Sequence, residues 1–280
     1  MRFNRTHLLL LCSALVPACA IPGDAPWSDV HANVFAAGFT PTLNATSSNL
    51  VVPDTNGGVT PPDFRGSFKV NDDSSFTTYY GGRVGFAPFE ISASQFNHSS
   101  NNSGVITDNG SFFNGVELNG NLNVDAAFDI DATKLMVGID VLNTSIARVG
   151  ILGGIDMFNF NRFAFTATEA NGSIAVGGVQ NVLINQEVPV PIVGVRGDVH
   201  LPGTNLRLGG EITGVSIDID EIDASFIDVD VNVNYEIFTN AEAVVGYRKV
   251  ALNIDGVIED TTINMDLNMS GPYFGVSIYY

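Results

Sequence analysis

Apolar and polar residues alternate one by one along several stretches of this chain. Between Ile227 and Ile237 every odd position is apolar and every even position is polar. The same alternation runs from Val116 to Ile130, and it returns from Ile263 to the final residue, Tyr280. A period of two residues is typical of β-strands, because successive side chains point to opposite faces of a sheet. The pattern therefore predicts strands with one apolar and one polar face.

These runs are long for strands of a soluble protein. Several reach the roughly 9 to 11 residues that a tilted membrane-spanning strand needs, whereas an average strand has about 5 to 6. We therefore expect an all-β fold, a closed antiparallel transmembrane barrel of about twelve strands with lipid outside and water inside. A sandwich of two sheets, with the same alternation but a shared core, is the alternative. The expected strands are 30–43, 76–86, 89–98, 115–131, 134–144, 147–157, 163–173, 188–201, 205–218, 222–237, 241–256 and 260–280.

The connections between these strands predict two unlike rims. Short turns at 87–88, 132–133, 203–204 and 239–240 are expected on the rim that also carries both chain ends, which would be the periplasmic one. Long loops near 44–75 and 98–114, rich in Pro, Gly, Ser and Asn, are expected on the external side. Aromatic residues should mark the membrane interface at the short-turn rim. They are Phe86, Phe89, Phe158, Phe160, Phe163, Tyr235, Phe238 and Tyr280.

The first twenty residues have the pattern of a secretory signal peptide. Arg2 and Arg5 precede an apolar run from Leu8 to Val16, which is followed by Ala18-Cys19-Ala20. Cleavage after Ala20 would leave a single barrel domain, 21–280. A lipoprotein signal that leaves Cys19 lipidated is the alternative. Since the leader contains both cysteines, the mature chain would form no disulfide and no thiolate metal site.

The net charge restricts the partners. The whole chain has 12 Lys and Arg against 30 Asp and Glu, and the leader holds two of the basic residues, so the mature charge is 10 − 30 = −20. Such a chain will not bind nucleic acid through its overall field.

The C-terminal segment carries a specific resemblance. Phe274, Val276 and Ile278 alternate up to the terminal Tyr280 and resemble the signal by which the barrel assembly machinery recognises outer-membrane proteins. Together with Gly246-Tyr247-Arg248 and Gly271-Pro272-Tyr273-Phe274-Gly275, they are similar to motifs of a broad, mostly uncharacterised group of Gram-negative outer-membrane β-barrel proteins. The resemblance covers about 188–280. It implies a location in the outer membrane, and lipid, lipopolysaccharide and the assembly machinery as partners. It implies no catalytic residues.

The polar positions of the alternation predict which residues line the barrel interior. Arginine facing lipid would cost about 2 to 4 kcal/mol near the midplane, so these groups should point inward. Near Arg248 the apolar positions change from odd residues, Val245 and Tyr247, to even ones, Val250, Leu252 and Ile254, which predicts a β-bulge there. The predicted lumen residues are Arg83, Arg148, Arg196, Arg248, Glu90, Asp140, Asp156, Asp198, Asp228 and Asp230, together with Glu117, Asp125, Asp129 and Glu236.

Three functions are consistent with these features. A lumen filled by Arg and Asp pairs favours a structural or interaction role, while a partly open lumen would make a narrow channel that favours cations. A hydrolase of outer-membrane lipids is the least favoured, because His98 with Ser99 and Ser100 lacks a Gly-x-Ser-x-Gly motif. The acidic turn around Asp218–Asp223 has no calcium-binding motif. We expect neither an enzyme nor a cofactor or dedicated metal, and the oligomeric state is not predicted.

Overall fold

The computed structural model describes residues 30–51, 63–71, 76–113, 116–169, 180–182, 186–219, 222–258 and 261–280. The predicted signal peptide and Cys19 lie outside these residues. The described chain is built of β-strands and turns, with no helix among its elements. No helix long and apolar enough to cross a membrane was found in this part of the chain. The strands are β1 (Val30–Phe39), β2 (Thr42–Val51), β3 (Asp63–Asn71), β4 (Thr77–Phe86), β5 (Phe89–Phe113), β6 (Val116–Asn143), β7 (Ala147–Glu169), β8 (Gln180–Val182), β9 (Gln186–His200), β10 (Leu206–Ile219), β11 (Ile222–Phe238), β12 (Ala241–Ile258) and β13 (Thr261–Tyr279).

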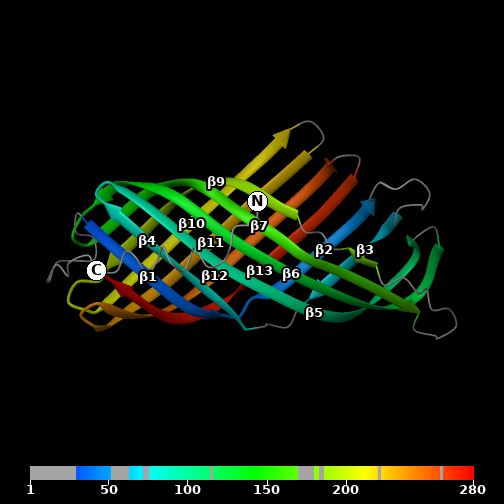
Figure 1. Cartoon of the computed structure of the whole chain (residues 1–280), viewed down its shortest axis with the longest axis horizontal. Helices are drawn as coiled ribbons and strands as arrows, with labels where there is room; N and C mark the ends of the chain where they lie inside the picture. The colour runs from blue at the N-terminus through cyan, green and yellow to red at the C-terminus, as the bar shows by residue number, and fades with distance from the viewer. Residues whose placement is uncertain are drawn as a thin grey trace.

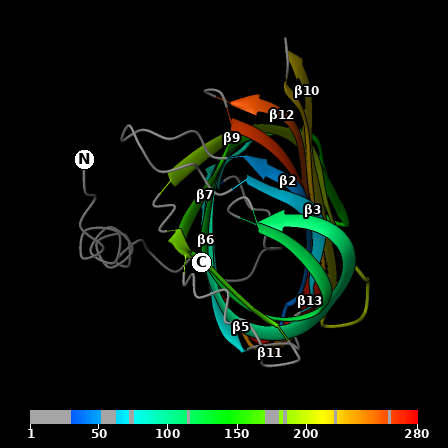
Figure 2. The ribbon, with the colours of Figure 1, turned by 90° about the vertical axis from the view of Figure 1, so that its right-hand side faces the viewer.

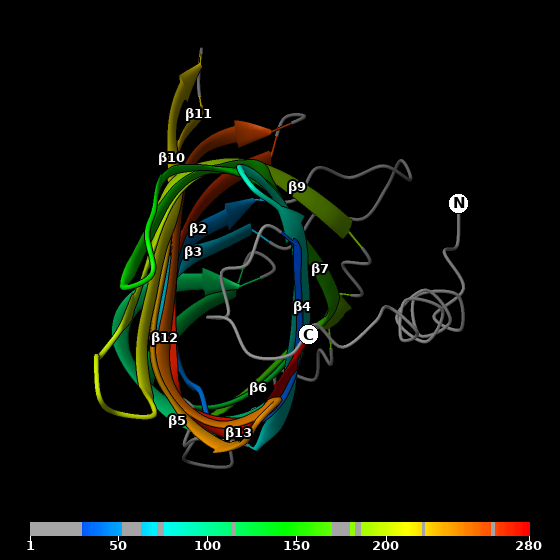
Figure 3. The same ribbon diagram turned by 90° about the vertical axis from the view of Figure 1, so that its left-hand side faces the viewer.

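The strands close into an antiparallel barrel. Around the ring the order is β1, β4, β5, β6, β7, β9, β10, β11, β12 and β13, and β13 returns to β1 with Phe35 opposite Ser277. Seen end-on, the ring is continuous and oval (Figure 3). The closed all-β barrel predicted from the alternation is therefore confirmed, and the sandwich is excluded.

The wall continues beyond β1 through β2. Two prolines interrupt this edge at neighbouring positions, Pro272 opposite Thr40 and Pro41 opposite Gly271, and neither proline has an N–H to donate. The N–H of Thr40 still donates to the carbonyl of Pro272 at 3.1 Å, so the two strands follow one line along β13. β3 pairs with β2 and touches β5 at Arg65 opposite Phe112. These strands extend the barrel at the end that faces the viewer in Figure 2.

The two rims of the barrel differ. Along the long axis in Figure 1, one end gathers the turns at 87–88, 144–146, 201–205 and 239–240. We call it the short-turn rim, and the opposite end the far rim. Both ends of the described chain lie at the short-turn rim, where Ala32 and Tyr280 exchange backbone hydrogen bonds of 3.1 and 2.8 Å. Gly203, with φ at 76°, provides the left-handed residue of one turn.

The ring has ten strands where twelve were expected. The predicted turn at 132–133 lies inside β6, and the predicted break at 158–162 lies inside β7, so each of these strands was counted twice. The predicted loops are also corrected: the first contains β2 and β3, and the residues from His98 to Phe113 belong to β5. No bulge occurs at Arg248, which pairs in unbroken register with Asp230 and Gly271.

The outer surface near the short-turn rim is apolar. On β11 the outward residues from Ile227 to Ile237 are large and apolar, and Val231 is half exposed. Ten residue steps of about 3.3 Å at a tilt of about 40° span about 25 Å along the barrel axis. Exposed aromatic residues edge this apolar band at the short-turn rim, namely Phe86, Phe89, Tyr235, Phe238 and Tyr280. Phe158, which was expected there, lies buried inside the barrel, and the side chains of Phe160 and Phe163 are not described.

Toward the far rim the two faces exchange character. On β12 the outward residues Lys249, Asn253 and Asp255 are polar and exposed, while the inward Val250 and Leu252 are buried. The strand keeps its register across this change. The apparent parity change in the sequence was therefore a change of surroundings and not of backbone geometry.

Candidate functional site: the filled barrel interior

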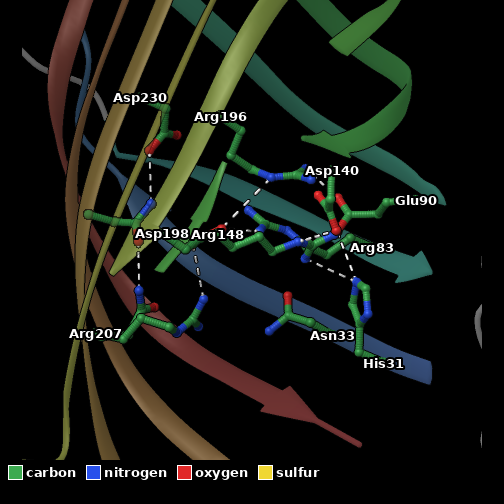
Figure 4. A network of polar contacts seen from close by, with 12 residues as sticks. His31, Asn33, Arg83, Glu90, Asp140, Arg148, Arg196, Asp198, Arg207 and Asp230 are labelled. Atoms are coloured by element: carbon green, nitrogen blue, oxygen red, sulfur yellow. Dashed lines mark hydrogen bonds and ion pairs between the residues drawn. The ribbon is translucent and has the colours of Figure 1, made fainter. Parts of the chain in front are cut away.

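Charged side chains from most strands meet inside the barrel, within the apolar band. Near the short-turn rim, four arginines and four carboxylates form what we call the lower ion cluster (Figure 4). Each member comes from an inward position of its strand, one residue away from outward apolar neighbours. The members are Arg83, Arg148, Arg196, Arg207, Glu90, Asp140, Asp198 and Glu242.

Glu90 of β5 is the centre of one half of this cluster. Its Oε2 lies 2.7 Å from Arg148 Nη2 and 2.9 Å from His31 Nε2, and its Oε1 pairs with Arg196 Nη1. Arg148 also donates through Nε to Asp140 Oδ2 at 2.7 Å. The side chains of this half are almost fully buried. A pair buried this deeply is stabilising only when its partners are all present, because removing one leaves an uncompensated charge.

Asp198 of β9 is the centre of the other half. Its oxygens lie 3.4 Å from Arg83 Nη1 and 3.4 Å from Arg207 Nη1. Arg207 in turn makes a bidentate ion pair with Glu242 on β12: its Nε donates to Oε1 at 3.2 Å, and its Nη2 donates to Oε2. This half connects β4, β9, β10 and β12, so ion pairs bridge opposite sides of the wall.

A second group, the upper ion cluster, lies next along the axis toward the far rim. Arg248 donates to Asp228 through Nε at 3.1 Å and Nη2 at 2.7 Å. Its guanidinium lies 4.9 Å from the ring centre of Tyr79 and 4.8 Å from that of Phe96. Lys134 contacts the same Asp228, Glu211 Oε1 at 3.2 Å and Thr213 Oγ1 at 3.0 Å. The cluster consists of Lys134, Arg248, Asp156, Glu211, Asp228 and Asp230.

Two carboxylates of the upper ion cluster have contrasting surroundings. Asp230 accepts hydrogen bonds from Tyr273 Oη at 2.6 Å and from Tyr79 Oη at 3.2 Å. Asp156 is fully buried, and neither of its oxygens has a hydrogen-bond partner among the described residues. Lys134 is the cross-strand neighbour of Asp156, but its ammonium group turns to Asp228 instead. Four carboxylates thus share two cations, and Asp156 is left without a direct partner.

A small cavity lies between the lower and upper ion clusters. It has a volume of about 80 Å³ and is lined by Arg83, Lys134, Arg207, Glu211 and Asp230, with amides and hydroxyls between them. One water needs about 10 to 15 Å³ measured in this way, so the cavity holds a handful of waters and no larger molecule.

Apolar side chains fill the interior beyond the upper ion cluster. Phe39 packs against Phe96 with ring centres 5.7 Å apart, and Phe158 packs against Phe226 at 5.4 Å. Leu252 completes a layer that is almost entirely buried. This apolar plug includes Phe39, Leu43, Phe96, Ile130, Phe158, Val190, Ile192, Phe226, Val250, Leu252, Leu267 and Met269.

The sequence predicted fourteen lumen residues, and one of them is wrong: Asp129 lies on the outer face of β6, opposite the exposed Ser99. Glu236 shares the inward face of β11, and the side chains of Glu117 and Asp125 are not described. The other ten point into the barrel, and eight of these ten join the ion-pair networks by salt bridges. The exceptions are Asp156, without a direct partner, and Asp230, held by tyrosines. Sequence reasoning missed Arg207, Glu211 and Glu242, although each alternates with outward apolar or small neighbours. It also missed Lys134, because a turn was expected beside it. The apolar plug was missed because apolar residues were expected to face outward.

The other candidate groups are not brought together. His98 is buried on the inner face of β5, whereas Ser99, the next residue, is exposed on the outer face. The side chain of Ser100 is not described. Asp218 and Asp223 are cross-strand neighbours, and Asp220 and Glu221 lie outside the described residues. Within the described part of the chain, no group of three or more His, Cys, Asp or Glu side chains is arranged to hold a metal ion.

Comparisons with known proteins relate the fold to outer-membrane barrels. No family model and no curated protein matches the sequence. The outer membrane protease OmpT from Escherichia coli has a similar structure, with a TM-score of 0.54, 12% identity, and coverage of 94% of this chain and 99% of that chain. The toluene transporter TodX of P. putida (TM-score 0.31, 9% identity, 90% and 89% coverage) and TbuX of Ralstonia pickettii (0.35, 7%, 90% and 89%) align less well. At these identities the likeness shows the fold alone.

Proposed function

We propose that this protein is an integral outer-membrane barrel with a closed interior, serving a structural or interaction role. The apolar band of about 25 Å matches the lipid-facing height of outer-membrane barrels. The fold likeness to OmpT supports the same location. In this placement the short-turn rim and both chain ends face the periplasm, and the far rim faces the exterior. The leader, 1–20, would direct export.

Two successive barriers along the barrel axis support the proposal of a closed interior. The two ion clusters connect opposite walls inside the band, and the apolar plug fills the barrel beyond them. An ion crossing the barrel would have to separate buried ion pairs and then enter a dry apolar layer, each of which costs several kcal/mol. The cavity between the clusters holds only a handful of waters.

Planar-bilayer recording tests the closed interior. We expect refolded wild-type protein to insert without stepwise conductance. A variant with smaller side chains in both barriers should conduct. It combines Glu90→Ser and Arg196→Ser in the lower ion cluster with Phe96→Ala and Leu252→Ala in the apolar plug. Heat-modifiable migration on denaturing gels is the control for folding, and accessibility to protease from one side of vesicles is the control for insertion. Stepwise currents from the folded wild-type protein would refute the proposal.

A narrow channel that favours cations is the second candidate, and one observation favours it. The upper ion cluster contains four carboxylates and only two cations, so a permeating cation would be attracted there. The reversal potential in a salt gradient distinguishes the two functions. If the wild type conducts with cation selectivity that Asp156→Asn reduces, the channel function holds.

The last strand supports recognition during biogenesis. Phe274, Val276, Ile278 and Tyr280 are exposed on the outer face of β13, in the alternation that resembles the assembly signal. We propose that the barrel assembly machinery binds this strand, and that the folded barrel then contacts lipid and lipopolysaccharide. Removing Tyr280 should lower the amount of folded protein in outer-membrane fractions. Unchanged amounts would show that the signal lies elsewhere. The proposal assigns no catalytic activity.

A further inference from the structure

A groove of about 570 Å³ lies on the barrel wall where the outer face changes from apolar to polar. It begins at Phe76, directly before β4, and at Thr77, the first residue of β4, and it extends across β5 and β6 to β7. Its polar lining consists mainly of Asn97 on β5, Asp129 and Asp131 on β6, and Asn161 on β7. We call it the boundary groove. Two buried residues, His98 and Ile130, also contribute to its lining, and Ile130 belongs to the apolar plug. The outward polar residues of the groove belong to neither ion cluster nor the apolar plug.

The strand register aligns these polar groups in rows. Asn97 is opposite Asp131, and Ser99 is opposite Asp129, so their side chains share the outer face of the wall. Hydrogen bonds fix the carboxylates: Asn161 Nδ2 donates to Asp131 Oδ2 at 2.7 Å, and Ser99 Oγ donates to Asp129 Oδ1. Carboxylate, amide and hydroxyl groups therefore stand at fixed positions along one side of the groove.

An aromatic ring forms the opposite side. Phe76 lies at the start of β4, and the outward direction of Gly38 on β1 points into its ring. The ring therefore lies against the outer wall, because Gly38 has no side chain to displace it. Phe76 is still 67% exposed, so it offers a free apolar surface next to the polar rows.

The height of the groove places it beside lipid headgroups. Leu135 of β6 is exposed in the apolar band, and Asp131 lies four residues farther toward the far rim. Four steps of about 3.3 Å at a tilt of about 40° raise Asp131 about 10 Å above Leu135. The headgroup zone of a bilayer is about 5 to 8 Å thick on each side. In the proposed orientation, the groove is thus level with the headgroups of the outer leaflet and just above them.

We infer that the boundary groove binds the saccharide headgroup of an outer-leaflet glycolipid. Neighbouring sugar hydroxyls can donate to a fixed carboxylate, and amides both donate and accept. The C–H face of a sugar ring can pack on an aromatic ring. Carboxylates and amides are acceptors suited to hydroxyl donors, so the proposed ligand is a hydroxyl-rich sugar. This inference rests on the proposed membrane placement but not on the closed interior, so bilayer conductance has no bearing on it.

Binding of the core oligosaccharide released from lipopolysaccharide tests the inference directly. Its affinity for the detergent-solubilised barrel would be measured by microscale thermophoresis with fluorescently labelled protein. The proteins compared are the wild type, Asp131→Ala and Phe76→Ala. Asp255→Ala is the matched control, because it removes an exposed outward carboxylate from β12, beyond the apolar band. Heat-modifiable migration would confirm that each variant is folded.

We expect the wild type and Asp255→Ala to bind alike, and each groove variant to bind at least about tenfold more weakly, corresponding to about 1.4 kcal/mol. In nanodiscs, lipopolysaccharide should raise the melting temperature of the wild type, and less so that of the groove variants. Equal binding by all four proteins, or no binding by the wild type, would overturn the inference. So would binding that EDTA abolishes, because divalent ions would then be bridging carboxylates to phosphate.

Discussion

Replacing Arg248 with methionine should destabilise the barrel more than most single substitutions. The change keeps an unbranched side chain between Tyr79 and Phe96 but removes the guanidinium that pairs with Asp228. Asp228 would remain buried, and among the described residues Lys134 would be its one remaining cationic contact. Breaking a buried pair on one side typically costs about 3 to 5 kcal/mol. Two cation–π contacts add about 1 kcal/mol, so we expect a loss of about 4 to 6 kcal/mol.

The free energy of unfolding would be measured by urea titration in lipid vesicles, with far-UV circular dichroism and heat-modifiable migration as probes. The double variant Arg248→Met with Asp228→Leu is the control, since it removes both charges. Lys134 then keeps Glu211 and Thr213, and we expect more than half of the lost stability to return. A loss below about 1 kcal/mol in the single variant, or no recovery in the double variant, would refute the view that paired charges hold the interior together.

Two further substitutions test other parts of the structure. Asp156→Asn should raise the free energy of unfolding by about 1 to 2 kcal/mol, because it removes a buried carboxylate that has no direct partner among the described residues. A loss of stability in the same urea titration would refute this reasoning. Val231→Arg, in the middle of the apolar band, should lower the free energy of unfolding in vesicles by about 2 to 4 kcal/mol. Asn253→Arg, beyond the band, should change it by no more than about 0.5 kcal/mol. Equal losses for the two variants would contradict the placement of the membrane.

Much of the wall could be predicted from the sequence, because a period of two determines both the strand and the side of each residue. The run from Ile227 to Ile237 indicated the lipid-facing residues of β11, and its polar partners Asp228 and Asp230 indicated part of the interior. The partners within the interior could not be predicted. Lys134 forms its ion pair with Asp228 and not with its cross-strand neighbour Asp156. This pairing depends on which strands face one another across the barrel.

The errors in the strand count share one physical cause. The false turn at 132–133, the false break at 158–162, the early end of the strand at His98 and the supposed bulge at Arg248 all lie near the level where the outer face becomes polar and the apolar plug begins. The rule that apolar residues face outward fails at the height where the outer face changes from apolar to polar, which in the proposed placement is the boundary between lipid and water. The strands pass through that level without interruption. A barrel that continues beyond its apolar band gains stability by burying apolar residues inside its projecting wall, and the apolar plug does this. In the proposed function the same plug separates the charged lumen from the exterior.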